Sequence, residues 1–249
     1  MKVSMFGVTL LLLALSGSLT LAEGPARSLG AGTGVVTASE REGPCGFLRI
    51  AGEGTYDNAY AWDPWFNQDP PYYCSFAEYF TGQSPEVCAV VLDLTKPGDF
   101  PPVLVDAFVW EHDAGADTPG NVLAIALNVD IGPVATWPDF TRVVVPLSYP
   151  AYPTGSWWAG FCLVGTFGYD YPVYYIGADQ SYQPAQGRPF TNVAPDWGYP
   201  PGWQHVDTVW GYTSHLGIGI LAHTVQPGST PDLPGGEMTT WGRIKSLSR

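Results

Sequence analysis

The second half of this chain holds a group of residues whose chemistry matches that of sugar recognition. Trp197, Tyr199 and Trp203 lie close together in the sequence, with Arg188 and Asp196 before them. Rigid aromatic rings stack on the apolar face of a sugar and lose little conformational entropy in doing so. Guanidinium and carboxylate groups hydrogen-bond hydroxyls. These five residues are candidate ligand-binding residues, and the alternative is that the rings pack as a cap over the fold.

A second candidate is the acidic segment EHDAGAD, residues 111–117, in which Asp113 and Asp117 are candidate metal ligands. Ca²⁺ takes six to eight oxygen ligands, but this segment does not match the loop pattern of an EF-hand. Asp and Gly are also favoured turn residues. We therefore expect a solvated turn and no required cofactor, with Ca²⁺ as the alternative.

Motifs of nucleophilic or metal-dependent catalysis are absent from the sequence. It holds no G-x-S-x-G, no H-E-x-x-H, no phosphate-binding glycine loop and no C-x-x-C. The paired carboxylates of a glycosidase have no fixed sequence spacing, because they meet only in the folded protein. The expected protein is therefore not an enzyme, and a glycosidase remains an alternative.

The composition describes an acidic protein with a sizeable core. The formal net charge is −13, and 45% of the residues are hydrophobic while 13% are charged. Such a chain repels the phosphates of nucleic acids and anionic membrane surfaces, which excludes nucleic acid as a partner. It is also neither a disordered chain nor a coiled coil.

The elements that position these candidates are expected to be strands, because 30 glycines and 24 prolines leave few segments for helices. Residues 103–110 and 121–129 are two apolar runs around a polar segment, and the second run alternates apolar and small residues. This pattern predicts an antiparallel hairpin, with Pro119 and Gly120 in a turn that needs a positive φ at the glycine.

The remaining strands follow from the same alternation. They are expected at residues 47–50, 56–62, 72–80, 87–94, 142–147, 157–167, 172–178 and 215–222. The strands at 72–80 and 87–94 are separated by a short connection and are predicted to pair. We therefore predict an all-β fold, an antiparallel β-sandwich of jelly-roll-like kind with about nine strands. One long aromatic loop, residues 179–214, lacks strand periodicity and is the expected functional surface.

The two ends of the chain are expected to serve export. Residues 1–22 combine Lys2, a short apolar run and a small-residue end, which predicts a cleaved secretory signal peptide. Residues 23–43 are interpreted as a flexible leader, 44–224 as the β-sandwich domain and 225–238 as a linker before the ending at 239–249. The mature chain is expected to have no membrane span and to be secreted or attached to the cell surface.

Four cysteines in an exported chain predict two disulfides, for which three pairings exist. Cys74 and Cys88 lie on consecutive predicted strands, so we predict that they pair. Cys45 and Cys162 would then join the N-terminal arm to the body of the domain.

Several segments of this chain resemble segments of other proteins. Val109-Trp110, Asp113, Gly115 and residues 119–123 correspond roughly, with longer spacings, to the pattern V-W-x-D-x-G-G-x-P-G-N-V-L. Further matching pieces are NAYAW, PPYYCSFAE, DIGPVATWPD, FTNVAP, GYPPGW and SHLGIGI, within residues 56–222. With them the chain resembles an uncharacterised group of secreted bacterial β-sandwich proteins. The resemblance implies the fold and secretion, and it implies no activity.

The ending TTWGRIKSLSR resembles a C-terminal tag shared by otherwise unrelated secreted bacterial proteins. The resemblance implies recognition by export or sorting machinery, and the alternative is a frayed basic tail. Taken together, we expect a secreted or cell-surface, non-enzymatic β-sandwich that binds an extracellular glycan. The alternatives are a structural or self-assembling surface protein, for which open edge strands would be evidence, and the glycosidase.

Overall fold

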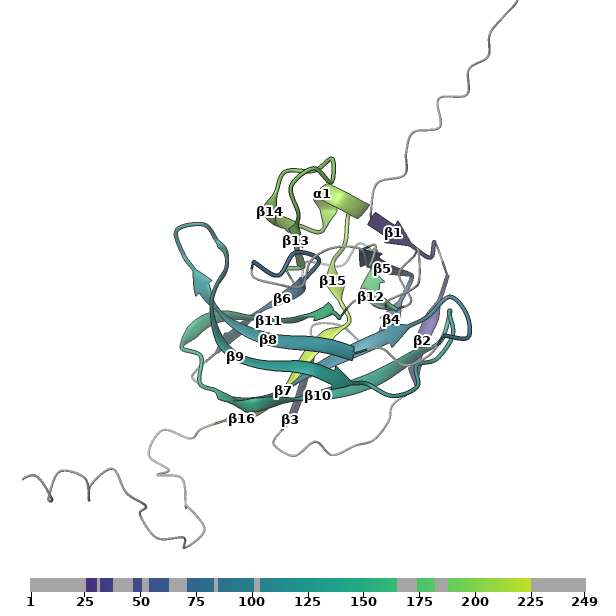
Figure 1. The fold of residues 1–249 in the computed structure, drawn as a ribbon. Helices are drawn as coiled ribbons and strands as arrows, with labels where there is room; N and C mark the ends of the chain where they lie inside the picture. Colours follow the sequence, from purple (N-terminus) through teal and green to yellow (C-terminus); the bar gives the residue numbers. More distant parts are fainter. Residues whose placement is uncertain are drawn as a thin grey trace, which may run out of the picture.

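Strands dominate the computed structural model, which describes residues 26–30, 32–37, 47–50, 54–62, 71–82, 85–100, 104–164, 174–181 and 188–224. These residues form sixteen strands and one short helix. The strands build two sheets that pack face to face (Figure 1). The predicted all-β antiparallel sandwich is therefore confirmed. The count exceeds the expected nine because several short strands extend the sheets.

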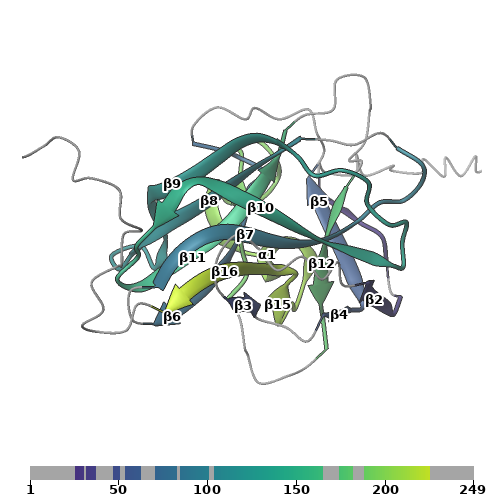
Figure 2. The same ribbon diagram turned by 90° about the horizontal axis from the view of Figure 1, so that it is seen from below.

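The larger sheet has ten strands, and the long strand β7 (Pro85–Thr95) lies in its middle. Its main path runs β1 (Ala26–Ser28), β5 (Asn58–Trp62), β12 (Tyr175–Asp179), β7, β10 (Phe140–Ala151), β2 (Gly34–Thr37) and β4 (Thr55–Tyr56). Off this path, β15 (His215–Leu216) pairs with β12, and β16 (Ile218–Thr224) pairs with β7 and with β3 (Phe47–Ile50). Figure 2 shows β16, β7 and β10 side by side.

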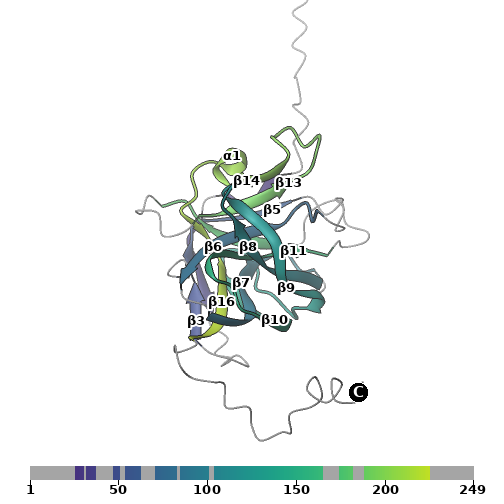
Figure 3. The ribbon, with the colours of Figure 1, turned by 90° about the vertical axis from the view of Figure 1, so that its left-hand side faces the viewer.

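The smaller sheet has six strands and contains both strands of the predicted hairpin. Its order is β14 (Gly202–His205), β13 (Phe190–Val193), β6 (Phe76–Gly82), β11 (Gly155–Leu163), β8 (Leu104–Asp113) and β9 (Thr118–Asp130). Figure 3 shows this layer above the strands β7, β10 and β16 of the larger sheet. Leu92, Trp157 and Ile220 belong to the apolar core, and all three are fully buried.

The hairpin β8–β9 is confirmed, with Phe108 opposite Ile125. Its predicted turn is wrong, because the tip is formed by residues 114–117 and Gly120 lies within β9. The residue with positive φ at the tip is Asp117, at 58°. Aspartate tolerates this left-handed conformation better than most residues, so the tip needs no glycine there.

The predicted pairing of the strands at 72–80 and 87–94 is wrong, because β6 and β7 lie in different sheets. The chain passes from the smaller sheet to the larger one between these two strands instead of turning back within one sheet. Cys74 and Cys162 are free and buried, so neither the Cys74–Cys88 nor the Cys45–Cys162 bond is present. The first pairing fails because Cys74 precedes a strand of the smaller sheet while Cys88 lies on β7 of the larger sheet.

The predicted long loop at 179–214 also contains regular structure. The hairpin β13–β14 extends the smaller sheet beside β6, and the helix α1 (Asp207–Trp210) follows it. Each of these strands has four residues, too few to show a period of two among the surrounding prolines and aromatic rings. In the predicted flexible leader, the described residues instead form β1 and β2, which pair with β5 and β10.

A buried ion pair lies inside the larger sheet. Arg142 donates to both carboxylate oxygens of Asp93, from Nε at 2.8 Å and from Nη2 at 2.7 Å. The Tyr56 hydroxyl donates to the same carboxylate at 2.6 Å. Burial, followed by the charge of Asp93, raises the pKa of Tyr56 well above its ordinary value. The Tyr56 hydroxyl therefore stays protonated at neutral pH.

The termini that were interpreted as a signal peptide, a linker and a C-terminal tag lie outside the described residues. No helix in the described ranges is long and apolar enough to cross a bilayer.

Candidate functional site

The outer face of the smaller sheet carries aromatic rings from adjacent strands. Trp158 of β11 lies opposite Tyr79 of β6 on one side and opposite Trp110 of β8 on the other. Residues that are directly opposite share a face, because side chains alternate along each strand. Trp157, one position earlier, points to the other face. Trp158 and Trp110 are themselves buried and belong to the same apolar core cluster as Trp157, so Tyr79 is the partly exposed ring of the row.

Arg188 covers this row of rings from the start of β13. Its guanidinium carbon lies 5.0 Å from the ring centroid of Tyr79, 5.6 Å from that of Trp158 and 5.8 Å from that of Phe190. Distances of this size are those of cation–π contacts. The guanidinium also donates two hydrogen bonds to Asp117, one of them at 3.1 Å. These bonds lower the pKa of the Asp117 carboxyl. The structure thereby joins two residues that the sequence assigned to different sites.

His112 connects the ring row to the same carboxylate. The indole N–H of Trp158 donates to His112 Nδ1 at 3.2 Å, so a neutral His112 carries its proton on Nε2. His112 Nε2 lies 3.5 Å from Asp117 Oδ1. Nearby, the Tyr79 hydroxyl donates to Ser156 Oγ at 2.6 Å. The β8–β9 hairpin is thus bonded to β11 through His112, and its tip is bonded to Arg188, just before β13, through Asp117.

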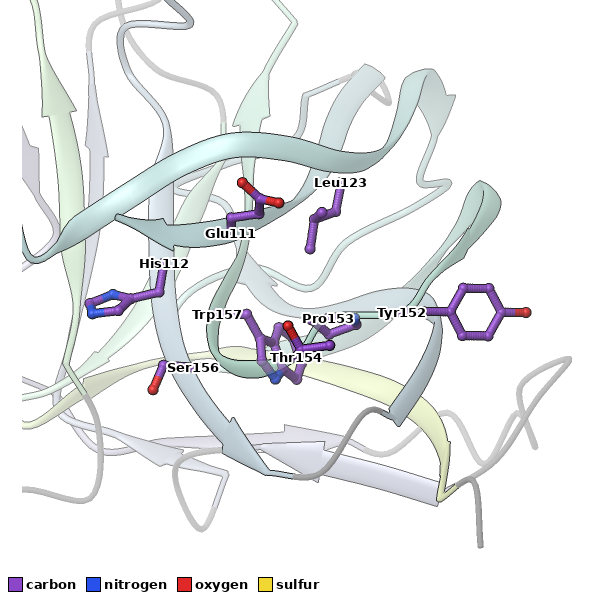
Figure 4. Close-up of a pocket in the computed structure, with 8 residues that line it drawn as sticks. All are labelled: Glu111, His112, Leu123, Tyr152, Pro153, Thr154, Ser156 and Trp157. Atoms are coloured by element: carbon purple, nitrogen blue, oxygen red, sulfur yellow. The ribbon is translucent and has the colours of Figure 1, made fainter. Parts of the chain in front are cut away.

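A hollow of about 200 Å³ adjoins this cluster, and we call it the Glu111 hollow. Its lining residues come from β8, β9, β11 and the connection between β10 and β11: Glu111, His112, Leu123, Tyr152, Pro153, Thr154, Ser156 and Trp157. In Figure 4 the carboxylate of Glu111 and the hydroxyl of Thr154 lie on opposite sides of the group. The rings of His112 and Tyr152 are directed away from the other lining side chains.

The accessible lining of the Glu111 hollow is mostly polar, with a smaller apolar part. Glu111 is exposed and accepts a hydrogen bond from Asn121 Nδ2 at 3.0 Å, which fixes its carboxylate at the rim. Leu123 and Pro153 supply apolar surface. The volume is below the 300 to 1,000 Å³ that is typical of pockets for drug-sized ligands. The hollow therefore has room for one small ring or a single residue of a longer ligand.

The three predicted stacking rings are not gathered at this site. Trp197 is 5% exposed and packs against Trp62, with ring centroids 4.3 Å apart. Tyr199 is half-buried at 6.2 Å from the same ring. Trp203, also half-buried, meets Trp110 edge-on at 5.4 Å. Trp197 therefore serves as packing, which agrees with the alternative stated for these rings.

Two other predicted site residues, Asp196 and Asp113, lie in or beside turns. Asp196 is exposed and lies in a turn with a φ of 69°. Asp113 accepts hydrogen bonds from the backbone N–H groups of Gly115 and Ala116, at 2.8 and 3.2 Å. These bonds are those of an Asx turn. Within the described ranges, no three or more His, Cys, Asp or Glu side chains are placed to hold a metal ion.

Sequence reasoning missed the residues that form the Glu111 hollow. Glu111 and Thr154 belong to segments that meet only because β8 pairs with β11. The row formed by Tyr79, Trp110 and Trp158 has a weak sequence signal, since each ring alternates with a core residue on its own strand. No single strand shows that these rings share a face.

No protein-family model matches the chain, and no curated protein is similar enough to count as a relative. Of the resemblance described above, the structure supports the two-sheet sandwich, and no family is identified.

Proposed function

We propose that the protein is a secreted or cell-surface, non-enzymatic β-sandwich that binds an extracellular glycan at the Glu111 hollow. The observation that carries the proposal is the lining of that hollow. A sugar ring presents hydroxyls around its edge and an apolar patch on its face. Glu111 accepts from hydroxyls, Thr154 both donates and accepts, and Leu123 supplies apolar contact.

A second set of fixed groups lies at the same end of the smaller sheet, on the face opposite to that of the paired residues Glu111 and Trp157. Tyr79, His112 and Arg188 are partly exposed there, and their planar groups are fixed by the contacts with Asp117 and Ser156. Fixed planar groups favour binding, because little side-chain entropy remains to be lost.

Two observations favour this function over the alternatives. Glu111 is the one carboxylate in the lining of this hollow, whereas glycoside hydrolysis uses two carboxyl groups about 5 to 10 Å apart. Strand-to-strand assembly needs long, open edges. The described edge strands β1, β4 and β14 have three, two and four residues, and the β8–β9 ladder at the other edge contains three register shifts.

The location at the cell surface rests on sequence features alone. Residues 1–22 have the pattern of a signal peptide, and residues 239–249 have that of a sorting tag. The tag would be read by export or sorting machinery, which is the second partner in this proposal.

Glycan-array binding of the full exported chain tests the function, followed by titration with any glycan retained. Glu111→Gln should weaken binding about 10-fold or more, because it removes a charged acceptor of hydroxyl groups. Tyr149→Ala is the matched control, since that ring is 52% exposed and does not line the hollow. Trp203→Ala distinguishes the Glu111 hollow from the aromatic segment around residue 200, because Trp203 does not line the hollow. Failure to bind any glycan, or unchanged binding by Glu111→Gln, would refute the proposal.

A further inference from the structure

The turn before β6 holds a cysteine in an unfavourable backbone conformation. Cys74 has a φ of 71°, in the left-handed region, where a side chain other than that of Gly or Asn is strained. The turn is held by the backbone N–H of Cys74, which donates to the carbonyl of Asn192 at 2.9 Å. The side chain of Asn192 returns a hydrogen bond to the carbonyl of Pro71 at 2.7 Å. These bonds hold the Cys74 backbone in this conformation at an energetic cost, which favours a role for its thiol.

The second buried thiol lies against this turn. Phe161 of β11 is opposite Phe76 of β6, so Cys162 comes next along β11, beside the residues that lead out of the turn. Cys162 Sγ is 3.5 Å from the backbone oxygen of Tyr73, the residue before Cys74. Cys162 is 1% exposed and Cys74 is 9% exposed. Two thiols thus adjoin each other in a site closed to bulk solvent.

The surroundings of the pair argue against a metal site and against a reactive thiol. The interaction with Cys74, then burial and the nearby carboxylate of Asp106 raise the pKa of the Cys162 thiol well above its ordinary value. A catalytic or metal-binding cysteine needs the thiolate, which these neighbours disfavour. The described residues supply no third group that would complete a metal site with these thiols.

We propose that Cys74 and Cys162 are joined by a disulfide bond in the exported protein. The S–S bond forms as each thiol loses its hydrogen, and the two electrons and two protons pass to an external disulfide, which is reduced to two thiols. The exchange takes place during folding, before β6 and β11 close over the sulfur atoms. Four cysteines allow three pairings, so this bond leaves Cys45 and Cys88 for each other. The inference rests on the proposed export of the chain and does not depend on the proposed glycan binding.

The bond would join two segments and close a loop of about 90 residues between them, which is long for a single cross-link. It would fix the turn at residues 71–74, whose backbone is bonded to Asn192 of β13. The hairpin β13–β14 reaches the rest of the smaller sheet through β6. The disulfide would therefore stabilise the attachment of this hairpin.

Non-reducing peptide mapping of the full chain tests the pairing. The chain is refolded in a buffer of reduced and oxidised glutathione, unfolded, alkylated and digested, and the peptides are identified by mass. The expected product is a peptide pair linked through Cys74 and Cys162, with neither residue alkylated. Alkylation of both residues, or a bond from Cys74 to Cys45 or Cys88, would overturn the proposal.

Thermal melting provides a second measurement. The oxidised protein should melt about 10 °C above the double variant Cys74→Ser/Cys162→Ser, as expected for a cross-link of this loop length. After reduction the difference should disappear, because the wild-type chain then lacks the bond as well. A difference that persists in the reduced proteins would show that the thiols act by packing, against the proposal. If the variant does not fold, the peptide map alone decides.

Discussion

Glu78 is a carboxyl group inside the core, and its titration should control the stability of the protein. It lies on β6, is fully buried and accepts hydrogen bonds from the backbone N–H of Leu216 at 2.9 Å and from the N–H groups of Arg188 and Tyr79. Burial raises its pKa to about 8, although the three backbone donors act in the opposite direction.

The sign of the effect follows from the raised pKa. Between pH 4.5 and about 8 the folded protein holds a proton on Glu78 that the unfolded chain has lost. The contribution of Glu78 to the free energy of unfolding is therefore fully present at low pH and is lost as the pH rises toward 8. Each pKa unit corresponds to about 1.4 kcal/mol, so the loss between pH 5 and pH 9 is about 4 kcal/mol.

Urea unfolding of the wild-type chain and of Glu78→Gln at pH 5 and pH 9 measures this loss. Glutamine does not titrate, so the wild type should lose about 4 kcal/mol more than the variant between the two pH values. A hydrogen bond that the glutamine amide fails to accept lowers the variant's free energy of unfolding equally at pH 5 and at pH 9. Such a loss therefore cancels when the two pH values are compared. Glu111→Gln is the control, since Glu111 is exposed and should leave the wild-type pH dependence unchanged.

Equal pH dependence in the wild type and in Glu78→Gln would refute this reasoning. It would mean that Glu78 is ionised throughout, with its charge held by the three backbone N–H donors instead of being removed by protonation.

Two further perturbations follow from the described ion pairs. Asp93→Asn should lower the free energy of unfolding by about 3 to 5 kcal/mol, because it leaves the half-buried guanidinium of Arg142 with a neutral partner; a loss below about 1 kcal/mol in urea unfolding would contradict this. Arg188→Met should leave the melting temperature nearly unchanged, since the bonded Asp117 is exposed, yet it should speed amide hydrogen exchange at residues 114–117. Unaltered exchange at the tip would show that Arg188 does not anchor it.

The parts of the fold that were predictable from sequence depend on local pattern. The hairpin β8–β9 was predicted because its strands are long and adjacent in sequence, with Phe108 opposite Ile125. The pairing of β6 with β7 was predicted by the same logic and is wrong, because a short connection also permits a crossing between sheets. The strands β13 and β14 were missed because four residues carry too little periodicity.

The candidate site was predictable only in fragments. Arg188 and Asp117 were both selected from the sequence, but for sugar binding and for metal binding, and they lie 71 positions apart. Their ion pair depends on the arrangement of β13 and the hairpin tip over the same sheet face. Thr154 was not selected at all, because a threonine in a short connection has no distinctive pattern and gains its role only through the β8–β11 pairing.

The central place of β7 determines when this chain can fold. One edge of β7 pairs with β10, and its other edge pairs with β12 and with β16, the last strand in the described sequence. A growing chain that stops before residue 218 leaves that edge of the central strand largely unpaired. The larger sheet can therefore be completed only after nearly the whole domain has been synthesised. Such late, non-local closure predicts slow folding, during which that edge of β7 stays open to pairing with other chains.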